Sequence, residues 1–217
     1  MTPAELRETV EVSIFPDQLF AENCYVIRRR DTQRVLVIDP GLQVDRVQQH
    51  LDRERLQVDR ILLTHGHIDH LAGAPQLRAR TAAPIAMHAE DLAILNWQQF
   101  ADYPFLPPGF GPFDLDQPLA AKMILDFEDI SVRVLHTPGH TRGSVCFLFG
   151  LDCFSGDTLF QRGIGRTDLP GGDTPSIVFS IRKVLYALPP RTVVYPGHGA
   201  ATTIEEEKLL NPFVPAV

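Results

Sequence analysis

Four potential metal ligands occur close together in the segment from Leu62 to Gly73, which reads LLTHGHIDHLAG. A β-strand that ends here would place residues two apart on one side, so His65 and His67 can approach one metal ion together. The turn into a following helix would direct Asp69 and His70 toward a neighbouring point. The segment can therefore serve two adjacent ions, and four unrelated surface residues are the disfavoured alternative.

Three further candidate ligands lie beside glycine, next to apolar segments: His140 in HTPGHTRGS, Asp157 in CFSGDTLF and His198 in VYPGHGA. Glycine allows the backbone to turn tightly and to approach an ion without a side chain in the way. Each of these residues alone is a weak signal, because a single histidine is more often structural. Together with the first cluster they indicate a metal site built from imidazoles and carboxylates.

The hydrophobic pattern predicts the elements that would hold these ligands at strand ends. In the first half we expect strands at 10–15, 24–28, 35–38, 60–63 and 84–87, and helices at 44–53, 71–80 and 89–98. In the second half we expect strands at 122–126, 130–135, 144–149, 153–155 and 192–195, a helix at 175–188 and a short terminal helix. The segment 100–118 is rich in proline and aromatic residues without periodicity, so it is expected to be an irregular loop, either a lid or a cover for the core.

In both halves the strands come first and helices follow. This order predicts two sheets packed face to face with helices outside, which is an α+β fold with four αββα layers. The sequence contains no internal repeat and no low-complexity linker. We therefore expect one domain over residues 1–217.

Composition narrows the range of functions. The net charge of −7 and the pI of about 5.6 disfavour a general nucleic-acid binder. The apolar runs are too short to span a bilayer, and the charged start lacks a secretory pattern, so we expect a cytoplasmic protein that does not bind membranes. Cys24, Cys146 and Cys153 form no CxxC pair, which favours buried reduced thiols.

The order THGHIDH, TPGH, SGDTLF and PGHG resembles the metallo-β-lactamase superfamily over nearly the whole chain. Within it the chain is most similar to the glyoxalase II-like hydrolases, the hydroxyacylglutathione hydrolase group, and particularly to its short bacterial members. The segments that support this similarity are ENCYVI, VIDPG, GIGRTDLPGGD and GAATTIEEEKLLNPF. The resemblance implies the metallo-β-lactamase fold with a binuclear metal centre.

The resemblance also implies a role for each ligand: one ion would be held by His65, His67 and His140, the other by Asp69, His70 and His198, with Asp157 bridging them. Such a donor set suits zinc, iron or manganese rather than copper(I), and two divalent ions, most simply Zn²⁺, are expected. Two cations would lower the pKa of a bridging water to about 7 or below. The resulting hydroxide would attack a small-molecule thioester such as S-lactoylglutathione, with Asp69 and Asp157 as the catalytic residues.

A second enzyme class resembles the same fold and shares the GRTD stretch. Persulfide dioxygenases use a single iron, which by motif would be held here by His65, His140 and Asp157. The number of bound metal ions and the uptake of oxygen distinguish the two. A nuclease, a β-lactamase or a metal-binding module without activity are further alternatives, which the acidic composition, the absence of a secretory pattern and the complete ligand set disfavour, respectively.

The resemblance is weaker at the C-terminus. Full-length glyoxalase II carries a helical domain there that supplies much of the glutathione site, and we expect this chain to lack it because few residues follow His198. Cations for an anionic glutathione thioester would then have to come from residues near the motifs, namely Arg142, Arg162 and Arg166.

Several residues near the motifs keep two interpretations. Asp39 either fixes the tautomer of a ligand histidine or forms an Asp-Pro-Gly turn. Arg166 and Asp168 either form an ion pair that holds their loop or contact the substrate. The remaining histidines, His50, His88 and His136, are expected to pack or to form hydrogen bonds.

Overall fold

A computed structural model describes residues 9–93, 95, 97–100 and 103–215. The chain divides into two compact units, an N-terminal unit over Thr9–Pro118 and a C-terminal unit that begins at Leu119. Each unit has its own sheet and is described by itself. The single domain expected from the sequence stays a prediction.

The N-terminal unit is built on a six-stranded sheet in the order β1-β2-β3-β4-β5-β6. Its strands are β1 (Val10–Pro16), β2 (Asn23–Arg29), β3 (Arg34–Ile38), β4 (Gln57–Leu62), β5 (Ile85–His88) and β6 (Gln117–Leu119). The first three strands pair antiparallel, whereas β3, β4 and β5 run parallel. Parallel pairing brings the carboxyl ends of β3 and β4 to the same edge, where the THGHIDH segment begins.

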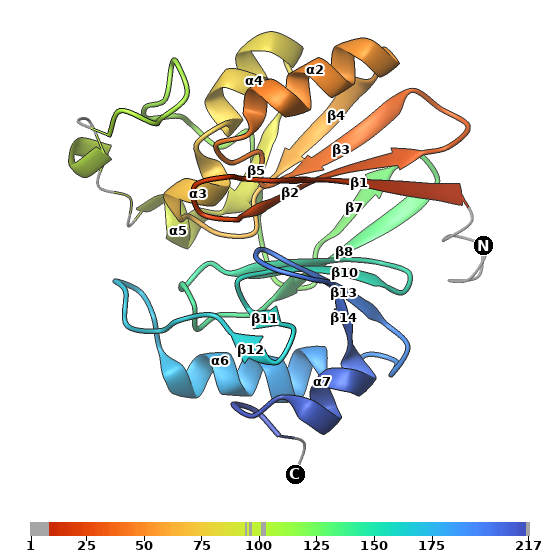
Figure 1. The fold of residues 1–217 in the computed structure, drawn as a ribbon, viewed down its shortest axis with the longest axis vertical. Coiled ribbons are helices and arrows are strands. Elements are labelled where there is room, and N and C mark those ends of the chain that lie inside the picture. The colour runs from red at the N-terminus through yellow and green to blue at the C-terminus, as the bar shows by residue number, and fades with distance from the viewer. Residues whose placement is uncertain (1–8, 94, 96, 101–102, 216–217) are drawn as a thin grey trace. The chain divides into compact units, whose positions relative to one another are not determined.

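Helices α2 (Val44–Glu54) and α4 (Ala74–Thr81) lie on one face of this sheet, as Figure 1 shows. The helix predicted at 44–53 is confirmed as α2, which is amphipathic, with Val44, Val47 and Leu51 buried in the core. The opposing strand residues include Val26, Val37, Ile61 and Ile85. This core fixes the strand ends from which the candidate ligands project.

The helix predicted at 71–80 is in fact two helices, α3 (Ile68–Leu71) and α4. Gly73 separates them, because its Cα lies so close to the carbonyl oxygens of Pro40 and Gly41 that a Cβ would overlap both. Pro75 then occupies the first turn of α4, where its missing amide hydrogen costs nothing. Because of this break, the candidate ligands Asp69 and His70 lie on the separate short helix α3.

The segment after β5 also differs from expectation. The helix predicted at 89–98 ends early as α5 (Ala89–Ala93), and a 3₁₀ turn η1 (Trp97–Phe100) follows it. Ile94 and Asn96 lie outside the described residues. The predicted loop 100–118 is irregular over most of its described length but ends in the short edge strand β6.

The C-terminal unit is built on a second six-stranded sheet, in the order β14-β13-β10-β9-β8-β7. These strands are β7 (Ile124–Phe127), β8 (Ile130–His136), β9 (Val145–Phe149), β10 (Asp152–Gly156), β13 (Val193–Pro196) and β14 (Thr202–Thr203). Residues 157–164 add a small hairpin of β11 (Leu159–Phe160) and β12 (Gly163–Ile164). The two-residue strands were not predicted, because so short a segment has no periodicity.

Two helices, α6 (Thr174–Ser180) and α7 (Ile204–Leu210), lie on one face of this second sheet (Figure 1). Of the two residues whose types could cap this helix, Asp173 and Thr174, Asp173 is the cap, since its side chain accepts a hydrogen bond of 2.8 Å from the Ser176 amide. The helix predicted at 175–188 changes to a π-helical turn over Ile181–Leu185. Ile177, Ile181 and Leu185 are nevertheless all buried in this core, because their helical spacing keeps them on one face.

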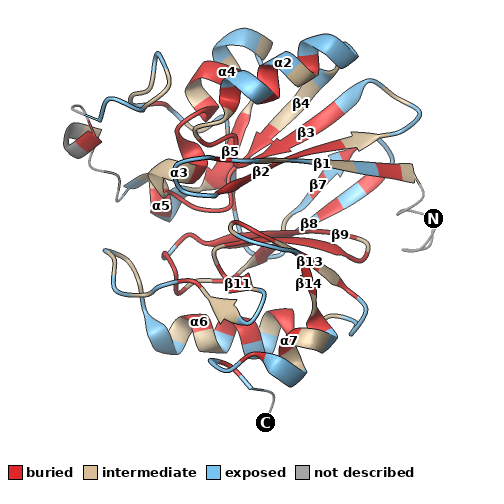
Figure 2. Cartoon of the chain, in the orientation of Figure 1, coloured by how far each residue is buried: buried red, intermediate tan, exposed pale blue. Residues whose placement is uncertain are grey.

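Burial follows the sheets (Figure 2), and the strands are largely buried while the outer faces of the helices are exposed. Cys24, Cys146 and Cys153 are all buried free thiols, as predicted. Burial and the nearby carboxylates of Glu22 and Asp39 raise the pKa of the Cys24 thiol, so it stays protonated. Within the described part of the chain, no helix combines the length and the apolar character needed to cross a bilayer.

Tyr186 supplies a pH-dependent contribution to stability. Its hydroxyl donates to the carbonyl oxygens of Glu207 at 3.0 Å and Val214 at 2.9 Å. Burial, with a smaller effect of the Glu207 charge, raises the pKa of Tyr186 to about 12. The hydroxyl is protonated in both states below about pH 10, whereas between about pH 10 and 12 the unfolded state loses its proton first. The free energy of unfolding should therefore fall across that interval.

Replacing Tyr186 with Phe should remove this alkaline component and lower the free energy of unfolding at neutral pH by about 1 to 3 kcal/mol. Urea unfolding of both proteins at a series of pH values up to about 11 measures the difference. Tyr103→Phe is the control, because the Tyr103 side chain is exposed. If the Tyr186→Phe and wild-type curves ran parallel across the whole interval, the assignment to this hydroxyl would be wrong.

Candidate metal centre

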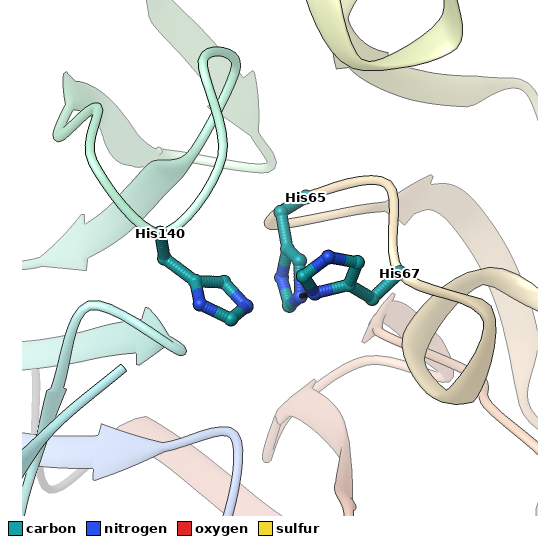
Figure 3. A group of neighbouring side chains, drawn as sticks. All are labelled: His65, His67 and His140. Carbon is teal, nitrogen blue, oxygen red and sulfur yellow. Dashed lines mark hydrogen bonds between the residues drawn. The ribbon is translucent and has the colours of Figure 1, made fainter. Parts of the chain in front are cut away.

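The THGHIDH segment brings together its three histidines and Asp69. His65 and His67 lie in the loop after β4, and Asp69 and His70 lie on α3. The His65 ring meets the His67 ring edge to face, with centroids 4.8 Å apart, and lies 4.2 Å from the His70 ring. His65 Nε2 lies 3.1 Å from His67 Nδ1, and Figure 3 shows the two rings close together at this contact.

Hydrogen bonds fix which nitrogen of His65 carries its proton. The Thr64 hydroxyl donates to Asp39 Oδ2 at 2.7 Å, because a carboxylate can only accept. The Thr64 oxygen, 3.0 Å from His65 Nδ1, therefore accepts the Nδ1 hydrogen. In the neutral imidazole the lone pair is then on Nε2, the atom that faces His67. This is the tautomer that a metal ligand needs.

The same carboxylate fixes His70. Asp39 Oδ2 lies 3.0 Å from His70 Nδ1, which places the proton on Nδ1 and the lone pair on Nε2, 3.7 Å from Asp69 Oδ2. Asp39 is almost wholly buried, and its other oxygen accepts the Thr64 amide at 2.8 Å. Asp39 also has a left-handed backbone conformation, with φ of +49°. These contacts support the interpretation in which Asp39 orients ligand histidines.

The loop between His65 and His67 is held from α5. Asp91, which is fully buried, accepts a hydrogen bond of 2.8 Å from the Gly66 amide. A Cβ at Gly66 would lie only 3.0 Å from the Asp91 Cβ, so the glycine permits this close approach. Asp91 could not be predicted from the sequence, because an acidic residue on a short helix 25 positions away gives no local signal.

The C-terminal unit gathers the other three candidates around one oxygen atom. His140 follows β8, Asp157 follows β10 and His198 follows β13. Asp157 Oδ2 lies 3.4 Å from His140 Nε2 and 3.5 Å from His198 Nε2. Figure 3 shows the His140 ring on its loop. The ends of three strands thus converge on one carboxylate.

The tautomer of His140 is also defined. Its Nδ1 lies 2.8 Å from the Arg166 carbonyl oxygen, which can only accept, so Nδ1 carries the proton. The Nε2 lone pair of the neutral ring is then directed at a carboxylate oxygen, and two lone pairs repel each other. Either protonation of His140 or a cation between the two atoms removes this repulsion. Imidazole nitrogens and carboxylate oxygens are the donors that zinc, iron and manganese accept, so the residues fit a divalent ion.

Arg166 and Asp168 form an ion pair with two hydrogen bonds of 2.7 Å. The pair lowers the pKa of Asp168 to about 2, and both side chains are exposed. This geometry favours the loop-holding interpretation of the two residues. Arg142 and Arg162 are exposed as well.

The three other histidines make the contacts expected of structural residues. His136 Nε2 lies 3.0 Å from the Arg142 carbonyl oxygen, and His88 Nδ1 accepts the Glu90 amide at 3.4 Å. The His50 ring packs against Phe15, with centroids 5.2 Å apart. Burial and the neighbouring Arg53 lower the pKa of His50.

The aromatic loop before β6 serves two purposes. Phe113 is buried in the core of the N-terminal unit and meets the Trp97 ring edge to face at 5.5 Å. Tyr103 and Phe105 instead stay exposed, and Phe105 contacts Phe20 of the β1–β2 turn at 5.7 Å. The loop is thus a cover at one end and offers an exposed aromatic surface at the other.

The sheets and the histidine and carboxylate groups at their strand ends define an α+β protein of the metal-dependent hydrolase type. Residues 17–198 match the model of the Metallo-beta-lactamase superfamily. The chain belongs to this superfamily, and the α+β fold class expected from the sequence is confirmed.

One curated relative is the hydroxyacylglutathione hydrolase GloC of Haemophilus influenzae, 35% identical over 213 residues that cover 94% of this chain and 98% of GloC. Among solved structures, the BLEG-1 B3 metallo-beta-lactamase is 33% identical with a TM-score of 0.85, covering 94% of this chain and 99% of its own. ETHE1 from Myxococcus xanthus is 31% identical with a TM-score of 0.79, at 94% and 84% coverage. TTHA1623 in a di-iron-bound form is 33% identical with a TM-score of 0.81, at 93% and 100% coverage.

Proposed function

We propose that the chain is a binuclear metal-dependent hydrolase that cleaves thioesters, and that the two groups of candidate ligands serve one centre. The observation that carries the proposal is that two histidines present an Nε2 lone pair beside a carboxylate oxygen. His70 Nε2 lies 3.7 Å from Asp69, and His140 Nε2 lies 3.4 Å from Asp157. In this proposal one ion takes His65, His67 and His140, the other takes Asp69, His70 and His198, and Asp157 bridges them. The match to the superfamily and the similarity to GloC support it.

We infer that Zn²⁺ is the simplest occupant, and that iron is an alternative. The similarity to a di-iron-bound structure supports two ions and keeps iron in consideration. When bound, two divalent ions supply a water of lowered pKa and polarise a carbonyl group. The protein supplies the geometry, because Asp39 holds the Nδ1 proton of His70 directly and that of His65 through the Thr64 hydroxyl, which leaves the Nε2 lone pairs for a metal ion.

A glutathione-derived thioester is the proposed substrate class. Hydrolysis of a thioester releases a thiolate, which leaves without a strong acid. This fits a site whose identified polar groups are the proposed ligands and the residues that hydrogen-bond to them. Because the substrate is an anion and the chain carries a net charge of −7, local cations are needed. Arg142 and Arg162 are exposed near the motifs and are candidates for this role.

The test is hydrolysis of S-D-lactoylglutathione by the purified chain reconstituted with zinc or with iron, followed as loss of the thioester absorbance. A kcat/KM above about 10⁴ M⁻¹s⁻¹ with two metal ions per chain is the expected result. Negligible hydrolysis by a fully loaded protein would contradict the thioesterase proposal.

The second candidate is a mononuclear iron persulfide dioxygenase that uses His65, His140 and Asp157. The structural similarity to ETHE1 favours keeping it as the alternative. Oxygen consumption with glutathione persulfide, together with one iron per chain, would establish this reading. Two ions and no oxygen uptake would exclude it.

A further inference from the structure

Glu207 is a buried carboxylate on α7, within the closing GAATTIEEEKLLNPF segment. Its Oε1 accepts a hydrogen bond of 2.7 Å from the Thr202 hydroxyl. Its Oε2 accepts from the Arg162 amide at 2.8 Å and from Asn211 Nδ2 at 2.8 Å. A buried carboxylate is tolerated when hydrogen-bond donors surround it in this way. The three hydrogen bonds therefore hold the Glu207 side chain in one position.

Two of these donors tie α7 to the β11–β12 hairpin. Arg162 lies at the hairpin turn in a left-handed conformation, with φ of +55°, and its amide reaches Glu207. Asn211 Nδ2 also donates to the Gly163 carbonyl oxygen at 3.1 Å. The hairpin turn is therefore held on α7 through both its amide and its carbonyl groups.

The hairpin connects Asp157, one proposed ligand, to Arg166, whose carbonyl oxygen contacts His140, another proposed ligand. It begins two residues after Asp157, and Gly165 at its exit lies so close that a Cβ would overlap the Asp157 carbonyl oxygen and reach 2.9 Å from His140 Nδ1. The carbonyl oxygen of the next residue, Arg166, accepts a hydrogen bond from His140 Nδ1. On the other side, Phe160 meets the His198 ring edge to face, with centroids 6.0 Å apart.

We propose that Glu207 is a positioning residue for the metal ligands of the C-terminal unit, acting through the β11–β12 hairpin on His140, Asp157 and His198. The inference rests on the proposed metal centre, which these three residues help to form. A shift of the hairpin turn would move the Arg166 carbonyl, the Gly165 backbone and the Phe160 ring together, and with them the three ligands.

Two substitutions separate position from charge. Glu207→Ala removes all three acceptor interactions and should weaken Zn²⁺ binding about tenfold, measured by competition with a chromogenic chelator. Glu207→Gln keeps an acceptor for Arg162 and Asn211, while its amide can donate to Thr202, whose hydroxyl turns to Glu206 Oε2 at 3.2 Å. The Gln variant should therefore bind zinc within about threefold of the wild type. Glu205→Ala, an exposed residue of the same helix, is the charge-matched control.

A measurement on the unmodified protein covers the case in which Glu207→Ala does not fold. Because coupling is reciprocal, zinc binding must stabilise the hydrogen bonds that hold the hairpin turn on Glu207 as much as those hydrogen bonds strengthen zinc binding. Amide hydrogen exchange of Arg162 should therefore slow on adding zinc, relative to the amides of β7.

The outcomes distinguish the two proposals. If the wild-type protein bound neither zinc nor iron, the proposed metal centre itself would be refuted. If zinc bound normally but Arg162 exchange did not change, or Glu207→Ala folded and kept wild-type affinity, the positioning role of Glu207 would be refuted. Equal losses in the Gln and Ala variants would also refute it, because the role requires the retained acceptor to rescue binding.

Discussion

Replacing Asp157 with Ala is expected to lower the turnover of the thioester at least about a thousandfold and to remove at least one metal ion per chain. Asp157 Oδ2 lies within 3.5 Å of both His140 Nε2 and His198 Nε2, so one substitution removes the carboxylate oxygen beside both rings. Metal analysis of the purified variant and steady-state hydrolysis measure the two effects. Asp157→Asn, which preserves volume, should show nearly the same loss and separates it from a cavity effect.

Asp126→Ala provides the matched control for Asp157. Asp126 is an exposed carboxylate on β7 of the same unit, so its removal changes the net charge equally without touching a candidate ligand. Its metal content and turnover should stay at wild-type levels. An Asp157→Ala protein with full metal content and full rate would show that Asp157 is not a ligand.

Replacing Asp39 with Asn should weaken metal binding by about 10- to 100-fold without unfolding the protein. Asparagine tolerates the left-handed backbone, with φ of +49°, and its oxygen can still accept the Thr64 amide. Its NH₂ group would take the place of Oδ2, which now accepts hydrogen bonds from the Thr64 hydroxyl and from His70 Nδ1. An NH₂ group donates, so it would need acceptors at both of these positions. His70 Nδ1 would then accept, and its proton would move to Nε2, the atom required for the metal.

Zinc competition and thermal unfolding together test this tautomer argument. The control is Asp17→Asn, since Asp17 is also a buried carboxylate that accepts hydrogen bonds, from the Leu19 and Phe20 amides and from Gln43. Asp17→Asn should leave zinc affinity unchanged. If Asp39→Asn were loaded as tightly as the wild type, hydrogen bonding by Asp39 would not control its histidines.

The candidate ligands could be identified because their signal is local. His65, His67, Asp69 and His70 lie within a few positions of one another, and the sequence order of TPGH, SGDTLF and PGHG adds the rest. The structure groups these residues within each unit, at the ends of strands whose apolar patterns were also legible. What remains a prediction is their joint coordination of ions.

The supporting residues could not be predicted, because their contacts join distant parts of the chain. Asp91 reaches Gly66 across 25 positions, and Glu207 reaches Arg162 across 45. Neither spacing produces a pattern that a sequence window can detect. The break at Gly73 has the same origin, since the carbonyl oxygens of Pro40 and Gly41 that require a glycine lie some thirty positions earlier. Tertiary contact, rather than helix propensity, ends the helix there.

Asp39 meets two requirements that select different amino acids. Its left-handed backbone is readily adopted by glycine, asparagine and aspartate, whereas the Thr64 and His70 donors call for a carboxylate, which only aspartate and glutamate provide. Aspartate alone belongs to both sets. No single replacement of Asp39 therefore meets both requirements. Glycine and asparagine adopt the backbone conformation but lack the carboxylate, whereas glutamate keeps the carboxylate but strains the backbone.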